Sequence, residues 1–399
     1  MEALRKLRTV IPIEKRNKWL VFSICLMALS LDNLSVSGGI TSTVSVQEAF
    51  NTTSTNATWV ISAYALTLGS FILIFGKLAD ILGADNIFLF GTCIMSLFAL
   101  ICAVIEKSVI ALIVFRAFQG IGASALVPSG IALTAGYFAH DFNVMQRANR
   151  LLSIALTGAF GIGTLIGGAF ALTNIGYKAF FYFVFALSFL CAITLTFTII
   201  PVPRHSQLHL SDLNYGGVFI LVAGLLLIIL GLTEGGHKWR QAAAYVTLPI
   251  GFLLVISVFL FETVYIRGYR VKHANEMPMD DGVAALKDAE APTTSEVSIN
   301  HSSSSEANID SIAKPTADET SPEPKKKVDW RLTMDYLFPP ECLKIPNFLV
   351  FLCLVITFFI DFTVLLTALF QYHQFIEHNT SIISSLKVFS MSVGEQPSG

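Results

Sequence analysis

Charged residues are scarce in this sequence, and their scarcity narrows the possible class of protein. Only 14% of the 399 residues are charged, whereas 54% are hydrophobic and 12% are aromatic. Average soluble domains carry about 25% charged residues, so this composition argues against a soluble protein. The formal net charge is −2, and so balanced a charge gives no reason to expect a nucleic-acid partner.

The sequence also lacks the patterns of metal-binding and catalytic sites. Its six cysteines include no Cys-x-x-Cys pair, and most lie inside apolar runs, so we expect small buried hydrophobic residues. His205 and His209 have helical spacing, but no acidic or thiol partner completes a ligand set. No nucleophile–base pair is evident. We therefore expect no metal, no cofactor and no enzymatic activity.

Long apolar segments are abundant. A membrane-spanning helix needs about 20 mainly apolar residues, and nine segments meet this requirement. Strands of a membrane β-barrel would alternate over about ten residues, and these segments do not. The nine segments are Trp19–Ile40, Trp59–Ala79, Ile87–Ile105, Val109–Tyr137, Leu151–Leu172, Ala179–Ile200, Tyr215–Leu232, Ala243–Ile266 and Phe348–Phe370. The sequence thus predicts an all-α integral membrane protein with about nine spans.

Basic residues favour one orientation of these spans. The tail of residues 1–18 carries six of them, and further ones at Lys77, Arg150 and Arg267 fall on the same side if the spans alternate. That side should be cytoplasmic. The first outer loop then contains glycosylation sequons at Asn51 and Asn56, although so short a loop could keep them too near the membrane. The sequons favour the plasma membrane over the vacuolar membrane.

A long polar interval separates the last predicted span from the others. Residues 272–330 contain four consecutive serines, scattered acidic residues, several prolines and three consecutive lysines. Such a composition cannot bury enough apolar surface to offset chain entropy, so we expect a disordered cytoplasmic linker. It is either a plain tether or a regulatory segment whose serines are phosphorylated. Residues 331–399 should then hold an interfacial segment, the last span and a tail.

Ionisable residues inside predicted spans are candidates for function. A charge in hydrocarbon is costly and normally faces a bundle interior or an aqueous cavity. Asp32 lies near the middle of the first span, Asp361 lies midway along the last, and Arg116 lies in the fourth. Because burial disfavours the charged form of a carboxyl group, Asp32 could exchange a proton. The alternative is a carboxylate capped by neighbouring polar groups for packing alone.

Arg116 and Gln119 lie one helical turn apart and should share a helix face. Arg116 stays charged even when buried, so it needs a carboxylate, a carbonyl cluster or water nearby. Asp32 is the obvious partner within the membrane. The alternatives for Arg116 are a direct role in transport and a structural ion pair.

Small residues are expected at helix contacts. Gly120 and Gly122 follow Arg116, and a glycine-rich run in the fifth span includes Gly163, Gly167 and Gly168. Small residues let helix backbones approach closely in membranes. We therefore expect these glycines to lie where helices pack.

Several motifs occur in a fixed order along the first five spans. A Gly-x-x-x-Asp-x-x-Gly loop falls on Gly76, Asp80 and Gly83 between the second and third spans. In the fourth span, Arg-x-x-Gln-Gly begins at Arg116. Further matches are Leu31-Asp32, Trp59 with Tyr64, and residues 163–168. With these motifs the chain resembles the major facilitator superfamily, specifically its fungal branch of fourteen-span drug:proton antiporters.

The resemblance implies a bundle of two six-helix halves, with two extra spans between them and alternating access around a central cavity. Residues 19–200 would be the N-terminal half, and residues 201–271 would hold the two inserted helices. The span Phe348–Phe370 would begin an incomplete second half, because about five expected spans are absent before Gly399. The chain would then be C-terminally truncated, and a helper chain could complete it. Thr164 stands in place of the proline of the antiporter signature.

The resemblance implies secondary active transport, with proton-coupled export of drugs or small organic cations across the lipid bilayer. Asp32 would exchange protons, Arg116 would tune it and Gln119 would line the route, with Asp361 as a second acid. The loop with Gly76, Asp80 and Gly83 would act in gating. The alternatives are a non-transporting membrane subunit, a nutrient sensor signalling through the linker, or an inactive truncated product.

Overall fold

The computed structural model describes residues 12, 16–202, 214–237, 245–266 and 268–269, together with scattered positions between 345 and 387. Within these ranges the regular structure is helical, and eight helices are long and apolar enough to cross a membrane. The predicted all-α membrane fold is therefore confirmed. The ninth predicted span, Phe348–Phe370, and the linker of residues 272–330 lie largely or wholly outside the described residues.

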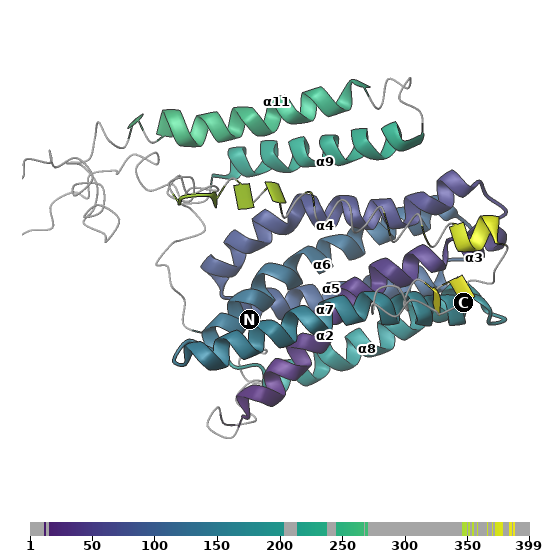
Figure 1. Cartoon of the computed structure of the whole chain (residues 1–399), viewed down its shortest axis with the longest axis horizontal. Helices are drawn as coiled ribbons and strands as arrows, with labels where there is room; N and C mark the ends of the chain where they lie inside the picture. Colours follow the sequence, from purple (N-terminus) through teal and green to yellow (C-terminus); the bar gives the residue numbers. More distant parts are fainter. Residues whose placement is uncertain are drawn as a thin grey trace, which may run out of the picture.

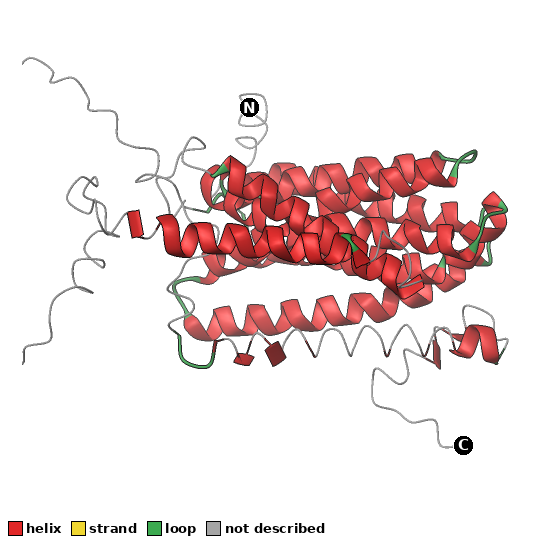
Figure 2. Cartoon of the chain, turned by 90° about the horizontal axis from the view of Figure 1, so that it is seen from above, coloured by secondary structure: helices red, strands yellow, loops and turns green. Residues whose placement is uncertain are grey.

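Six long helices form a bundle, and a hairpin of two further helices lies beside it (Figure 1). The bundle consists of α2 (Lys18–Thr41), α4 (Ser54–Leu82), α5 (Ala84–Val104), α6 (Val109–Phe138), α7 (Phe142–Ala171) and α8 (Tyr177–Thr198). The hairpin consists of α9 (Tyr215–His237) and α11 (Thr247–Leu260), which continues as the π-helix Phe261–Ile266. The long helices run side by side with their connections at the ends (Figure 2).

The helix α7 begins earlier than its apolar segment predicts. It starts at Phe142 rather than Leu151 because Asp141 caps its N-terminus. One carboxylate oxygen of Asp141 accepts hydrogen bonds from the backbone nitrogens of Asn143, at 2.9 Å, and Val144, at 3.3 Å. Such a cap satisfies donors that the first turn leaves free, whatever the hydropathy of that turn.

Part of the predicted first outer loop is also helical. The short helix α3 (Thr43–Phe50) follows α2 almost without a break. It ends at Asn51, whose backbone angles, φ 45° and ψ 49°, are left-handed. Asparagine tolerates this conformation better than most residues do. Only residues 51–53 separate α3 from α4.

Glycines bring α2 and α7 into backbone contact. A Cβ atom added at Gly163 would lie 2.8 Å from the Cα atom of Leu34, and one at Gly167 would lie 2.6 Å from that of Gly38. Real Cβ atoms do not approach so closely, so larger residues here would push α7 away from α2. Gly168 is buried as well. This contact fixes the helix that carries Asp32.

The helix α6 approaches its two neighbours in the same way. A Cβ atom at Gly120 would lie 2.4 Å from the carbonyl oxygen of Tyr64 on α4, and one at Gly122 would lie 2.8 Å from the backbone nitrogen of Met95 on α5. The close approach of α4 and α6 sets the distance between Tyr64 and Arg116. The glycines therefore determine the geometry of the site described below.

The hairpin packs on itself through glycine and reaches the bundle through α4. A Cβ atom at Gly251 of α11 would lie 2.7 Å from the carbonyl oxygen of Gly224 of α9. A small apolar cluster then joins Ile81 of α4 to the hairpin residues Val218, Leu221 and Val258. Figure 1 shows α9 lying along α4, with α11 beyond it. The hairpin is thus peripheral to the bundle.

Candidate functional site

The side chain of Arg116 lies at the centre of the bundle and is fully buried. Its Nε atom donates a hydrogen bond to the carbonyl oxygen of Val60 at 3.2 Å. Its Nη1 atom donates to Oγ of Ser35 at 2.9 Å and to Oε1 of Gln119 at 2.8 Å, and its Nη2 atom donates to the carbonyl oxygen of Ser35 at 3.3 Å. Every acceptor is a neutral oxygen. Backbone carbonyls and polar side chains therefore hold this permanent cation.

Tyr64 lies between Arg116 and Asp32. Its hydroxyl group donates a hydrogen bond to Oδ1 of Asp32, and its ring centroid lies 4.4 Å from Cζ of Arg116. Asp32 is 5% exposed and Tyr64 is 0% exposed. Among the described residues, no salt bridge joins Asp32 to Arg116. Of the alternatives that the sequence leaves open for Arg116, the structure shows carbonyl and side-chain oxygens as its acceptors, and the Tyr64 ring packs against the guanidinium group.

Helical spacing accounts for how the polar groups gather. Asp32 and Ser35 are three residues apart on α2, and Arg116 and Gln119 are three residues apart on α6, so each pair shares a face. Gly39 keeps the space beside the guanidinium group open, because a Cβ atom there would lie 3.1 Å from Nη2 of Arg116. Two helices thus contribute two polar groups each, and α4 inserts Tyr64 between them.

Gln119 is fully buried, and only one of the two polar atoms of its side chain has a hydrogen-bond partner in the described structure. Its Oε1 atom accepts from Arg116, whereas its Nε2 atom has no hydrogen-bond partner in the described structure. An unpaired buried donor costs about 1–3 kcal/mol. Phe181 of α8 covers another side of the guanidinium group, with its ring centroid 5.3 Å from Cζ of Arg116. Protein groups thus surround the guanidinium group of Arg116 on these sides, and Nε2 of Gln119 is the donor that remains without a partner in the described structure.

The predicted gating loop is the junction of α4 and α5. The helix α4 runs past Gly76 and the exposed Asp80, and Gly83 joins it to α5 with a φ of 96° and a ψ of 132°. Glycine adopts this positive φ without the steric cost that a side chain would add. Gly76 faces Pro128 of α6, which a Cβ atom would meet at 3.7 Å. The gating role of this loop stays a prediction.

The first sequon lies in the short turn between α3 and α4, and the second lies at the start of α4. Asn51 is exposed at the end of α3, and Asn56 is exposed in the first turn of α4. The Nδ2 atom of Asn56 donates a hydrogen bond to Oγ1 of Thr52 at 3.0 Å. Glycosylation stays a prediction. The remaining candidate, Asp361, lies outside the described residues.

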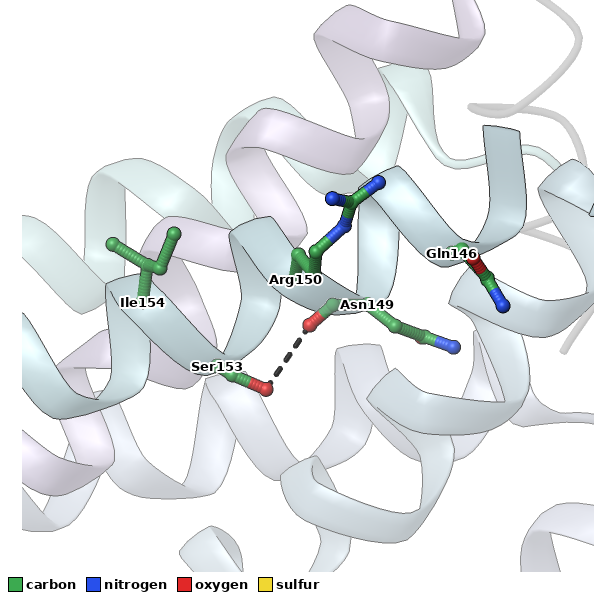
Figure 3. A pocket seen from close by; sticks show the side chains of 5 residues that line it. All are labelled: Gln146, Asn149, Arg150, Ser153 and Ile154. Carbon is green, nitrogen blue, oxygen red and sulfur yellow. Dashed lines mark hydrogen bonds between the residues drawn. The ribbon is translucent and has the colours of Figure 1, made fainter. Parts of the chain in front are cut away.

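The helix α7 carries a polar exposed face away from the central network. An open recess of about 480 Å³ is lined by Gln146, Asn149, Arg150, Ser153 and Ile154. Figure 3 shows these five side chains along one stretch of α7. These residues lie in the first turns of α7, mostly before the predicted start of the fifth span at Leu151 and on the side where basic residues are expected. Contact with water at the membrane surface accounts for their exposure.

Two side chains and one backbone carbonyl group of the central network are not predicted by the sequence. Tyr64 belongs to a motif that assigns it no role, and Ser35 belongs to none of the motifs. The signal for Ser35 is its position one turn after Asp32. The carbonyl oxygen of Val60 has no sequence signal, because every residue carries one. In the described part of the chain, no group of three or more His, Cys, Asp and Glu residues has the arrangement of a metal site.

Comparison with known proteins identifies relatives among transporters. A multidrug transporter of Aspergillus fumigatus is 27% identical over 235 residues, which are 58% of this chain and 43% of that one. A thioclapurine efflux transporter of Claviceps purpurea is 34% identical over 214 residues, with coverages of 51% and 38%. A riboflavin transporter of Clostridioides difficile is 25% identical over 255 residues, with coverages of 63% and 54%. The chain spans about half the length of these curated relatives.

A solved structure and a family model also match this chain. A bacterial homologue of the human lysosomal transporter Spinster, in an inward-facing and occupied conformation, matches with a TM-score of 0.40 and 16% identity over 64% of this chain and 65% of that one. The family model for the Major Facilitator Superfamily matches residues 20–394. The chain therefore belongs to the major facilitator superfamily.

Proposed function

We propose that this protein is a secondary active transporter that exports drugs or small organic cations in exchange for protons. Family membership supports the transporter class. The named functions of the relatives in Aspergillus fumigatus and Claviceps purpurea, multidrug transport and efflux, support export. In this proposal Asp32 binds and releases the coupling proton.

The state of Asp32 is the observation that carries the proposal. Its carboxyl group is buried in the middle of α2 and receives a hydrogen bond from the neutral hydroxyl group of Tyr64. A permanent cation in direct contact would hold a carboxylate in its charged form. Asp32 makes no salt bridge with Arg116 in the described structure, so in this proposal its carboxyl group can gain or lose a proton when a cavity opens to it. A coupling group must change charge in this way.

Arg116 and Gln119 take supporting roles in the proposal. Arg116 supplies a fixed positive charge beside the Tyr64 ring. Gln119 offers an unpaired amide donor that a substrate or a water molecule can use when the bundle opens. Asp361 is proposed as a second acid along the same route.

Transport by purified protein in proteoliposomes tests the proposal. An imposed pH gradient should drive movement of ethidium, a lipophilic organic cation whose fluorescence reports its concentration. Asp32→Asn should abolish the gradient-driven movement, because the amide cannot exchange a proton. Glu48→Gln is the matched control, since Glu48 is an exposed acid on α3. Unchanged gradient-driven movement in Asp32→Asn would remove Asp32 from the mechanism.

Two further parts of the proposal concern location and assembly. The exposed sequons at Asn51 and Asn56 favour the plasma membrane, and a mobility shift after glycosidase treatment would show their use. We also propose that a helper chain packs against the bundle. Size-exclusion chromatography with light scattering would show whether the protein is isolated with such a partner.

A further inference from the structure

Tyr64 makes two contacts that no other described side chain makes together. Its hydroxyl group donates to Oδ1 of Asp32, and its ring lies against the guanidinium group of Arg116, 4.4 Å from Cζ. The residue is 0% exposed, and Gly120 allows α6 to approach the backbone of Tyr64 itself. Its position is therefore fixed from both sides.

The two contacts act on Asp32 in opposite directions. A hydrogen bond to a carboxylate stabilises the ionised form of the acid. A ring held between the acid and the cation keeps them from the direct contact that would stabilise the ionised form much more strongly. Tyr64 thus supplies one neutral hydrogen bond to Asp32, and its ring occupies one face of the permanent cation.

We propose that Tyr64 is a positioning residue that holds the Asp32 carboxylate through its hydroxyl group and keeps it out of a direct ion pair with Arg116 through its ring. This inference rests on the proposed function, in which Asp32 carries the coupling proton. It extends that function by making Tyr64 the residue that sets the pH range of coupling.

The surroundings of Asp32 contain few other groups that respond to pH. Of the helices packed around it, α4 contributes Tyr64, which donates to its carboxyl group, and α6 contributes Arg116, which lies against the Tyr64 ring. A change in proton binding on altering Tyr64 can therefore be assigned to one of its two contacts.

Infrared titration of the full chain in lipid measures proton binding without any substrate. The carboxyl band of protonated Asp32 is identified by its loss in Asp32→Asn. Tyr64→Phe keeps the ring and removes the hydroxyl group, so the titration midpoint should rise by about one pH unit, a tenfold gain in proton affinity. Tyr137→Phe is the matched control. Tyr137 is also buried on the bundle side of α6, and its hydroxyl group donates to the carbonyl oxygen of Ile200 at 3.1 Å.

A midpoint in Tyr64→Phe equal to that of the wild type, or moved equally by Tyr137→Phe, would overturn the inference. Tyr64→Leu tests the ring separately and serves if Tyr64→Phe does not fold. Its midpoint should lie below that of Tyr64→Phe and below that of the wild type, because Arg116 can then contact Asp32 directly, and this contact outweighs the lost hydrogen bond. Equal midpoints in the two variants would show that the ring of Tyr64 does not keep Arg116 from direct contact with Asp32. A protein that titrates as expected but moves no ethidium would instead contradict the proposed function alone.

Discussion

Two pairs of opposite charge in this protein are arranged in contrasting ways. Inside the bundle, Asp32 and Arg116 are buried and separated by the ring of Tyr64. At the bundle surface, Nζ of Lys178 contacts Oε1 of Glu106 directly at 2.7 Å, and their side chains are 26% and 67% exposed. The buried pair avoids the contact that the surface pair makes.

The surface pair is in direct contact and the buried pair is not, because different groups stabilise the charges in the two places. Water solvates both members of the surface pair, so their contact changes little in free energy. In the bundle Arg116 is 0% exposed and obtains its hydrogen bonds from the oxygens of Val60, Ser35 and Gln119. Because these neutral oxygens accept from the guanidinium group, Asp32 does not have to do so. In the proposed mechanism this leaves the charge of Asp32 able to change.

The strongest test of this contrast removes the buried cation. Arg116→Gln should lower the free energy of unfolding by roughly 3 kcal/mol, because several buried acceptors lose a charged donor. Chemical unfolding of the protein in detergent, followed by circular dichroism, measures the change. Arg150→Gln is the control, since Arg150 is exposed on α7, and it should change the value by less than about 0.5 kcal/mol. Equal effects of the two substitutions would show that burial of Arg116 does not matter.

A smaller effect is expected from disturbing the helix that carries Asp32 and Ser35. In Gly163→Ala the new Cβ atom would lie 2.1 Å from Oγ of Ser37 and 2.8 Å from Cα of Leu34, so α7 must move away from α2. We expect a loss of about 1–3 kcal/mol in the free energy of unfolding. Gly158→Ala, on the same helix, meets nothing within 4 Å. This control should be neutral or slightly stabilising. A neutral Gly163→Ala would show that the close contact is not required.

The sequence predicts some parts of this contrast and not others. The spacing of Arg116 and Gln119 predicts that they share one face, and glycine at position 120 indicates a close helix contact. The interposed ring of Tyr64 is not predictable in this way. Helices in a membrane bundle are apolar toward lipid and toward the core alike, so their hydrophobic pattern does not say which face meets which helix. The partner of Arg116 depends on that choice, and spacing along one helix cannot supply it.

The smallest effect belongs to the surface pair. Lys178 lowers the pKa of the Glu106 carboxyl group from its ordinary value of 4.5, first by its hydrogen bond and then by its charge. Glu106 lies between α5 and α6, outside the helices that span the membrane. A lowered pKa in the folded state means that the contribution to stability is present above pH 4.5 and is lost as the pH falls through the folded value.

Glu106→Gln should therefore be slightly less stable than the wild type at pH 7, and this difference should disappear as the pH falls below 4.5, where the wild type loses the same contribution. Unfolding curves of the two proteins between pH 7 and pH 3 measure this difference, and added salt should reduce it because the pair is exposed. A difference at neutral pH that resists salt would mean that water does not screen the surface pair. The surface pair would then behave like a buried one, and exposure could no longer explain why it is in direct contact while Asp32 and Arg116 are held apart.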